Sequence, residues 1–435
     1  MVENQLTNKI KTAYFVLIAT MMYYFITEII NLGIFVTFRH AFALVLAASG
    51  LIVFLFKPNI ARGIESVKCA FFYSMPLLVT IMASLFIWFT NTVDTAVISR
   101  GLSGAFIYSN MLSFALASAA FLYIFGEKGI WYNLIAILAA NILMIGTIII
   151  ENGIGNYFRE LIELITTFAA KTGDIIVQAE IHELAFCLGA YLIYMFMKPR
   201  KDIVFIILVS LTLFCFLSAF KRIGIIAIVI ALALGWLLKL LSKLNEKLAF
   251  RTTVFLGLLL VAALICYVAL IKMGAFELLE KAGIDTSGRV EIYNEVDKYY
   301  EFSPSFLGNG IGFLTYSLST SGALEVSSVH NDFLQYFIDL GFWGYILWLL
   351  SMTVFRICYF GAKGKTDNAI TVFVLTVYLI IVSTTDNTMN YPLLTAVLAI
   401  LMAGCGFDER VRQKEQKMFG YISNENRKKE GEFLI

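Results

Sequence analysis

The apolar residues of this chain come in blocks of about twenty, and these blocks limit the possible fold more than any other feature. A helix of that length crosses the ~30 Å of hydrocarbon in a bilayer. We identify twelve candidate spans, at residues 12–30, 41–56, 69–90, 104–125, 130–150, 181–197, 203–219, 223–238, 252–271, 337–355, 369–385 and 392–407. Of the 435 residues, 60% are hydrophobic and only 15% are charged, too few charges for a soluble domain. The sequence therefore predicts an all-α polytopic membrane protein.

The distribution of Lys and Arg predicts how these spans are oriented. With the N-terminus in the cytoplasm, 23 of the 33 basic residues fall in inner segments, as the positive-inside rule requires. An even number of spans then places both termini in the cytoplasm. We expect nine spans in residues 1–271, a large outer loop at 272–336, three spans in 337–407 and a cytoplasmic tail at 408–435. Segment 151–180 is amphipathic, which predicts a helix along the outer surface.

The loop at 272–336 has a polar pattern that the rest of the chain lacks. A cap-like start precedes a predicted helix near 289–301, and four of its residues share one face: Arg289, Tyr293, Val296 and Tyr300. Three glycines then predict a tight turn: Gly308, Gly310 and Gly312. They are not the dinucleotide-binding fingerprint, because position 313 is Phe. A polar run from Ser328 to Asp332 leads into an apolar helix at Phe333.

Two arginines and a histidine fall on the predicted outer side of the membrane. Arg222 lies at the outer end of the eighth span, Arg289 in the loop and His330 at the mouth of the tenth span. The planar fork of Arg suits a diphosphate, and His can accept a proton near neutral pH. Such a set could hold a lipid diphosphate leaving group and deprotonate an acceptor hydroxyl. The plainer alternatives stay open: Arg289 as a solvated helix residue, and His330 as a helix cap or interfacial residue.

Two further charges flank this set. Lys221 precedes Arg222, and its plain interpretation is a side chain that extends to the interface. Asp386, between the last two spans, indicates either a site or a polar turn that ends at Pro392. All six cysteines fall inside apolar blocks and form no metal-binding pattern. We therefore expect no metal, no cofactor and no nucleic-acid partner.

Four motifs, taken in order, resemble the bacterial O-antigen ligase/polymerase superfamily. The run from Ser328 to Gln335, followed by residues 339–344, is similar to that family's His-Asn pair, apolar helix and Gly-x-x-Gly. The loop motifs at 287–293 and 303–310 resemble the family's loop, Arg222 its arginine-bearing span start, and Asp386 with Pro392 its penultimate motif. The resemblance covers roughly residues 215–400, and the first half matches only in hydropathy. Lys221 and the shortness of the loop depart from the family pattern.

The resemblance implies an inverting, metal-independent glycosyltransferase of the GT-C type in the bacterial inner membrane. It would act at the outer face on oligosaccharides carried by undecaprenyl diphosphate, with a chain-length regulator protein and membrane lipids as further partners. Arg222 and Arg289 would hold the donor diphosphate, and His330 would activate the acceptor hydroxyl. Four residues would bind substrate: Asn331, Tyr293, Asp386 and Lys221.

Two alternatives to a polymerase of O-antigen or capsule repeat units remain. A ligase would move finished polysaccharide onto the lipid A-core of lipopolysaccharide, but nothing in the sequence specifies that acceptor. A transporter or flippase of lipid-linked oligosaccharide would bury charge at mid-membrane and often contain repeats. Here nearly every ionisable residue falls at a span end, and no repeat is visible.

Overall fold

The structure is a computed structural model that describes residues 2–25, 38–90, 111–167, 182–219, 221–283, 286, 288–321, 329–362 and 366–418. All regular secondary structure in these residues is helical. The longer helices are α1 (Val2–Tyr24), α2 (Phe38–Phe56), α3 (Ile60–Thr90), α5 (Lys128–Asn152), α6 (Ile154–Thr167), α8 (His182–Met197), α9 (Ile203–Ser218), α10 (Arg222–Leu244), α11 (Glu246–Lys272), α15 (Asp332–Met352), α17 (Thr366–Ser383) and α18 (Pro392–Gly404). The shorter ones are α12 (Ala275–Lys281), α13 (Arg289–Val296), η1 (Asp297–Tyr299), α14 (Phe313–Ser321), α16 (Val354–Ala362) and η2 (Thr388–Asn390).

Seven helices in the described residues are long and apolar enough to cross a membrane: α2, α3, α5, α10, α11, α17 and the stretch Asp332–Gly361 formed by α15 and α16. An eighth forms if α18 and the helix Phe407–Met418, which meet at 51°, are one span. Three shorter apolar helices are Met111–Phe125, Glu183–Met197 and Ile203–Ser218. The prediction of an all-helical polytopic membrane protein is confirmed. The count of twelve stays a prediction, because four of the predicted spans fall on helices that are shorter or more polar.

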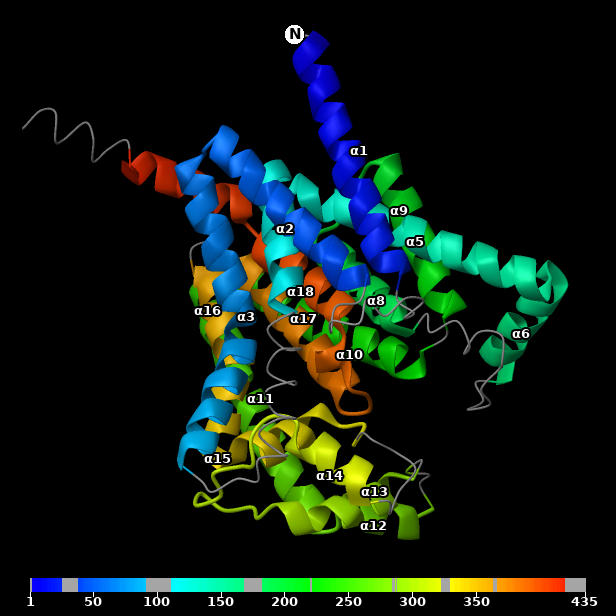
Figure 1. The fold of residues 1–435 in the computed structure, drawn as a ribbon, viewed down its shortest axis with the longest axis vertical. Helices are drawn as coiled ribbons and strands as arrows, with labels where there is room; N and C mark the ends of the chain where they lie inside the picture. The colour runs from blue at the N-terminus through cyan, green and yellow to red at the C-terminus, as the bar shows by residue number, and fades with distance from the viewer. Residues whose placement is uncertain are drawn as a thin grey trace, which may run out of the picture.

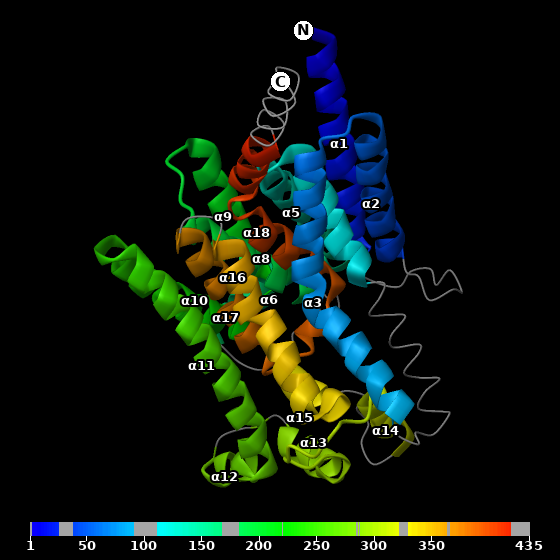
Figure 2. The same cartoon turned by 90° about the vertical axis from the view of Figure 1, so that its left-hand side faces the viewer.

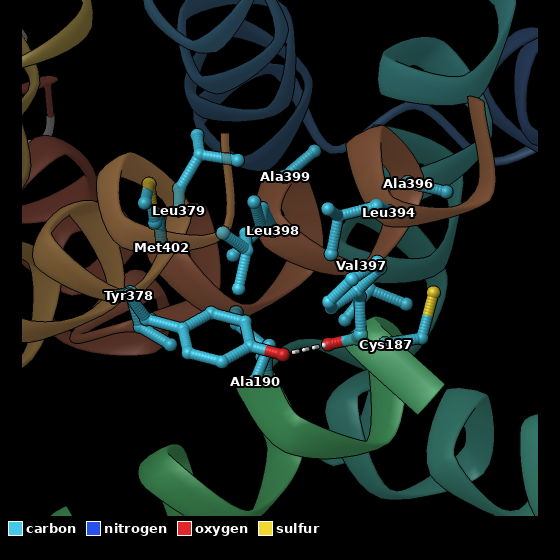
Figure 3. Packing of buried hydrophobic residues seen from close by; sticks show 14 of the residues in the cluster. Cys187, Ala190, Tyr378, Leu379, Leu394, Ala396, Val397, Leu398, Ala399 and Met402 are labelled. Atoms are coloured by element: carbon cyan, nitrogen blue, oxygen red, sulfur yellow. Dashed lines mark hydrogen bonds between the residues drawn. The ribbon is translucent and has the colours of Figure 1, made fainter. Parts of the chain in front are cut away.

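The centre of the bundle is α17, which is buried along nearly its whole length. It packs against α10, α8, α11 and α18. Figure 3 shows one such contact, where Tyr378 of α17 extends toward α8 and its hydroxyl donates to the carbonyl of Phe186 (2.9 Å). Gly189 makes room for this ring, because a Cβ there would lie 2.3 Å from the Tyr378 hydroxyl. Close packing of small residues against large ones is how helices associate where lipid removes the hydrophobic driving force.

The two ends of the bundle differ. Figures 1 and 2 both place α12, α13 and α14 together at one end, and the start of α1 at the other. The starts of α10 and α15 and the ends of α11 and α17 face the end that holds α13, as the bonds described below show. The predicted helix near 289–301 is formed by α13 and η1, and three of its predicted face residues are buried: Tyr293, Val296 and Tyr300. We call this end the α13 end.

A sharp bend divides α15. Gly341 has φ 70° and ψ −178°, so the helix breaks there and resumes in another direction. The turn with the three predicted glycines fills the break, and its residues Gly308, Gly310 and Gly312 have φ of 91°, 87° and 83°. Its Gly310 N–H donates to the carbonyl of Asp339 (2.8 Å), and the Phe342 N–H donates to the carbonyl of Phe306 (2.9 Å). These bonds satisfy backbone groups that the broken helix would otherwise leave unpaired.

The start of α15 lies close to the predicted one. The sequence predicts an apolar helix from Phe333 and a span from residue 337, and α15 starts at Asp332, capped by Asn331. Its first part packs back on the second, and the ring of Tyr336 stacks on that of Trp348 with centroids 4.2 Å apart. The bend thereby keeps the polar start of the helix at the α13 end.

Charged residues are not confined to span ends. Glu65 and Arg410 form a fully buried ion pair (2.6 Å), which Lys414 joins. Arg356, which the sequence places in an inner segment, lies buried within α16. The hydropathy pattern ends the tenth span at residue 355. In the structure α16 follows a break at Thr353 and continues the same apolar stretch to Gly361, so Arg356 falls inside it. Of segment 151–180, residues 154–167 form the predicted helix, α6, and residues 168–180 lie outside the described part.

Candidate functional site

The site is organised by Asn331, the residue that caps α15. Its side-chain oxygen accepts from the Leu334 N–H (3.2 Å), which is the usual N-cap bond. Its amide nitrogen donates to two phenol oxygens, those of Tyr267 (3.0 Å) and Tyr293 (2.9 Å). Asn331 is fully buried. One amide thus joins three elements, namely the end of α11, α13 and the start of α15.

These bonds leave one phenol hydrogen, that of Tyr293, for another acceptor. Each tyrosine oxygen receives a hydrogen from Asn331, and the Tyr267 hydroxyl also donates to that of Tyr293. Burial raises the pKa of Tyr293, against the opposing effects of Asn331 and of the Arg289 charge, so its phenol keeps its proton. A neutral hydroxyl donor therefore lies near the Arg289 guanidinium, which is a pair suited to the oxygens of a phosphate.

Arg289, the first residue of α13, reaches from the α11–α15 segment to the turn between α17 and α18. Its Nη2 donates to the carbonyl of Thr385 (3.1 Å) and its Nη1 to the carbonyl of Thr286 (3.3 Å). The Nε is buried and has no hydrogen-bond partner among the described residues. Arg carries five N–H donors, and these bonds use two of them. The guanidinium is therefore held in place while part of its fork remains available to a ligand.

The turn between α17 and α18 is tied to the start of α15 by Asp332. This carboxylate is fully buried, and its Oδ2 accepts from the Met389 N–H (2.9 Å). Its Oδ1 has no partner in the described residues. Asn331 and Asp332 are neighbours in sequence, so the same helix start holds both the tyrosine pair and this turn.

Asp386 and Lys221 meet at the other side of the same turn. The Asp386 carboxylate accepts from the hydroxyl of Tyr391 (2.9 Å) and from the Asn387 N–H (2.8 Å). Its other oxygen lies 3.9 Å from the Lys221 Nζ. Burial lowers the pKa of Lys221, and the Asp386 charge opposes that shift. The side chain of Lys221 therefore lies half-buried beside a carboxylate whose Oδ1 is engaged within its own turn and whose Oδ2 faces Lys221.

The remaining two predicted residues are exposed neighbours of this network. His330 precedes Asn331 and has φ 51°, the left-handed region that costs roughly 1–2 kcal/mol for a residue with a Cβ. Arg222 follows Lys221 and opens α10. Backbone strain of this kind is concentrated at functional sites. The strained backbone of His330 is therefore a second indication, beside its residue type, that this position belongs to a functional site.

Sequence reasoning missed two residues of the network. Tyr267 lies inside the apolar span α11, where a tyrosine gives no local signal of a polar role. Asp332 was visible in the polar run before Phe333, but nothing in the pattern indicated that its carboxylate bonds to the turn after α17. Of the predicted motif, Ser287 and Ser328 lie outside the described residues.

The arrangement presents cationic and hydroxyl groups that suit an anion. No group of three or more His, Cys, Asp or Glu side chains able to hold a metal ion occurs among the residues that the structure describes. Cationic and hydroxyl donors come instead from α10, α11 and α13. That donor set fits the negative charge of a phosphate ester or diphosphate.

Comparison with known proteins identifies the domain that contains most of these groups. No curated protein matches the chain. Residues 203–349 match the family model described as Wzy_C, O-antigen ligase. The match runs from the start of α9 into the second part of α15, and so includes Lys221, Arg289 and Asn331 but not Asp386. The chain is therefore a multi-pass membrane protein that carries an O-antigen ligase domain of the Wzy_C family.

Proposed function

We propose that the protein is a glycosyltransferase that joins oligosaccharide repeat units carried on undecaprenyl diphosphate, and so polymerises O-antigen or capsule polysaccharide. The Wzy_C domain supports this class, because that family implies lipid-linked glycan substrates. The reaction would be inverting and metal-independent and follow the GT-C pattern. The twelve predicted spans would place both termini in the cytoplasm and the α13 end at the outer face of the bacterial inner membrane, with residues 272–336 as an outer loop.

In this proposal the donor diphosphate binds between α10 and α13. Arg289 and Arg222 hold its oxygens, with Lys221 adding charge from the start of α10. Tyr293, positioned by Asn331, donates its phenol hydrogen to the same group. His330 takes the proton of the acceptor hydroxyl as the sugar–phosphate bond breaks, and the diphosphate leaves with the charge that the arginines stabilise. Asp386 holds Lys221 in place.

The observation that carries the proposal is the geometry of Arg289. Its two bonds to backbone carbonyls fix the guanidinium, yet its buried Nε is unpaired within the described residues. A buried, unpaired donor on a charged group is costly. A bound diphosphate would supply the missing acceptor, which is the physical reason to place the donor there.

The test uses purified protein and lipid-linked repeat units in detergent micelles. The wild type should form polymer without a sealed compartment, a result that a pure transporter cannot give. Arg289→Lys keeps the charge but loses the fork, and we expect at least a tenfold fall in polymer formation, about 1.4 kcal/mol of transition-state stabilisation. Lys281→Gln, which removes an exposed cation from the same segment, is the matched control and should behave as the wild type. Full activity in Arg289→Lys would remove Arg289 from the site.

A deletion strain separates the polymerase from the ligase. A polymerase deletion should accumulate single repeat units on the lipid carrier, whereas a ligase deletion should trap chains of normal length on it. We favour the polymerase because nothing in the sequence specifies a lipid A-core acceptor. Normal-length chains on the carrier would assign the protein to the ligase activity instead.

A further inference from the structure

The charge of Arg356 is buried within the bundle. The residue lies on α16, within the continuous apolar stretch Asp332–Gly361, and only 4% of it is exposed. Ionisable residues inside membrane spans are costly, and they usually serve a function. Arg356 takes no part in the network at the α13 end described above.

The contacts of Arg356 do not neutralise it. Its Nη2 donates to the carbonyl of Tyr73, and its guanidinium lies 4.1 Å from the centre of the Tyr73 ring. The Nε and Nη1 have no hydrogen-bond partner, and no carboxylate pairs with the side chain, in the part of the chain that the structure describes. By contrast, the equally buried Arg410 has Glu65 at 2.6 Å. An unpaired buried charge costs several kcal/mol, more than the roughly 2 kcal/mol that a ring can return.

A small cavity lies against this guanidinium. Its volume is about 40 Å³, and the residues that matter are Arg356, Tyr73, Tyr336, Trp348, Thr388 and Thr395. About 10–15 Å³ is enough for one water, so the cavity has room for a small ion or a few waters but not for a diphosphate or a sugar. Its lining includes three hydroxyl-bearing side chains besides Tyr73, all from helices other than α16.

We propose that this cavity binds one small monovalent anion, of the chloride class, on Arg356. Such an ion supplies both the acceptor that Nε and Nη1 need and the opposite charge that the guanidinium needs. Water alone would satisfy the N–H groups but leave the charge unpaired. The donors come from Arg356 itself, because the Thr388 hydroxyl bonds to that of Ser383 (2.6 Å) and the Thr395 hydroxyl to that of Tyr73, and the indole of Trp348 adds polarisable surface.

The site connects to the α13 end through the turn between α17 and α18. Thr388 and Met389 line the cavity, and the Met389 N–H donates a hydrogen bond to the Asp332 carboxyl group. The bound anion therefore lies directly beneath the turn that carries Asp386. We infer that the ion stabilises the packing of α16, α15 and this turn, as a structural ion that is distinct from the substrate.

The test measures halide binding to the full-length protein in detergent. Sodium gluconate is replaced stepwise by chloride or bromide at constant ionic strength, and the midpoint of thermal unfolding is read from tryptophan fluorescence. The wild type and Lys281→Gln should show a saturable rise on the order of a few degrees, which Arg356→Met should lose. Bromide, a heavy-atom quencher, should also give a saturable quenching component that disappears in Trp348→Phe.

Two results would overturn the proposal. The first is a wild type with the same midpoint in gluconate and chloride and no saturable quenching, which would mean that the cavity holds only water. The second is a folded Arg356→Met variant that keeps the halide response, which would place the ion elsewhere. If Arg356→Met does not fold, the wild type and Trp348→Phe decide the question by themselves.

Discussion

The double role of Asn331 gives a prediction that can be worked through bond by bond. Its side-chain oxygen caps α15 at Leu334, and its amide holds Tyr267 and Tyr293. An N-cap is worth about 1 kcal/mol, and each buried hydrogen bond about 0.5–1.5 kcal/mol. Asn331→Ala loses all three, so we expect the free energy of unfolding to fall by about 2–4 kcal/mol. Asn331→Ser keeps the cap, so its free energy of unfolding should be about 1 kcal/mol higher than that of Asn331→Ala.

The assay is reversible unfolding in mixed detergent micelles, combined with a double-mutant cycle. Tyr293→Phe removes one partner of the Asn331 amide and should cost about 1 kcal/mol. If the bond exists, Asn331→Ser combined with Tyr293→Phe costs less than the sum of the two single changes. Additive values would refute the bond, and equal stabilities of Asn331→Ser and Asn331→Ala would refute the cap. Polymer formation by Tyr293→Phe then reports separately on its hydroxyl as a donor.

Three further predictions concern backbone strain, the α15 bend and pH. His330 has φ 51°, so His330→Gly should be at least as stable as the wild type, and His330→Ala should be no more stable than the wild type. Both variants should lose polymer formation. An active His330→Gly would show that the imidazole is not needed. Gly341 has φ 70°, and Gly341→Ala would place a Cβ 2.1 Å from the main-chain carbon of Leu307. We expect this variant to lose more than about 2 kcal/mol of unfolding free energy. The control Gly146→Ala, whose Cβ would have nothing within 4 Å, should stabilise its helix slightly. The pKa of Lys221 is lowered by burial from 10.5, with Asp386 opposing. The unfolded chain then holds this proton more tightly, so the contribution of Lys221 to stability rises with pH between the two pKa values, and binding of an anionic substrate falls as alkaline pH removes the charge. Lys221→Arg should abolish that alkaline fall, and an unchanged pH profile would argue against contact of Lys221 with the substrate.

The elements of this fold were accessible to local patterns in the sequence. Apolar blocks predict the helices, because a backbone in lipid must satisfy its own hydrogen bonds. The spacing from Arg289 to Tyr300 predicts α13 and η1, since one face of a helix is set by residues three and four apart. The glycines from Gly308 to Gly312 predict the turn, which the structure confirms with three positive φ angles.

The relations between elements were not accessible in the same way. Nothing in the periodicity of α15 shows that Gly341 breaks it, because the break depends on the turn from Phe306 that packs into it. Tyr267 is a further case, since an aromatic residue in an apolar span has the same local pattern whether it faces lipid or an amide. Arg356 was counted as an inner-side charge, because hydropathy registers a sequence position and not the direction of a long side chain.

Both ends of the bundle hold ion pairs and a buried arginine Nε that is unpaired among the described residues, that of Arg62 opposite α13 and that of Arg289 at the α13 end, but they differ in their buried carboxylates. At the end opposite α13, Glu65 bonds to both Arg410 and Lys414, and Asp367 to both Lys198 and Lys239. Groups that are satisfied in this way stabilise the fold and have nothing left to offer a ligand. At the α13 end, the Arg289 Nε and the Asp332 Oδ1 are buried and unpaired within the described residues. A folded chain tolerates such groups where a ligand completes them, which is the physical ground for locating the chemistry at that end.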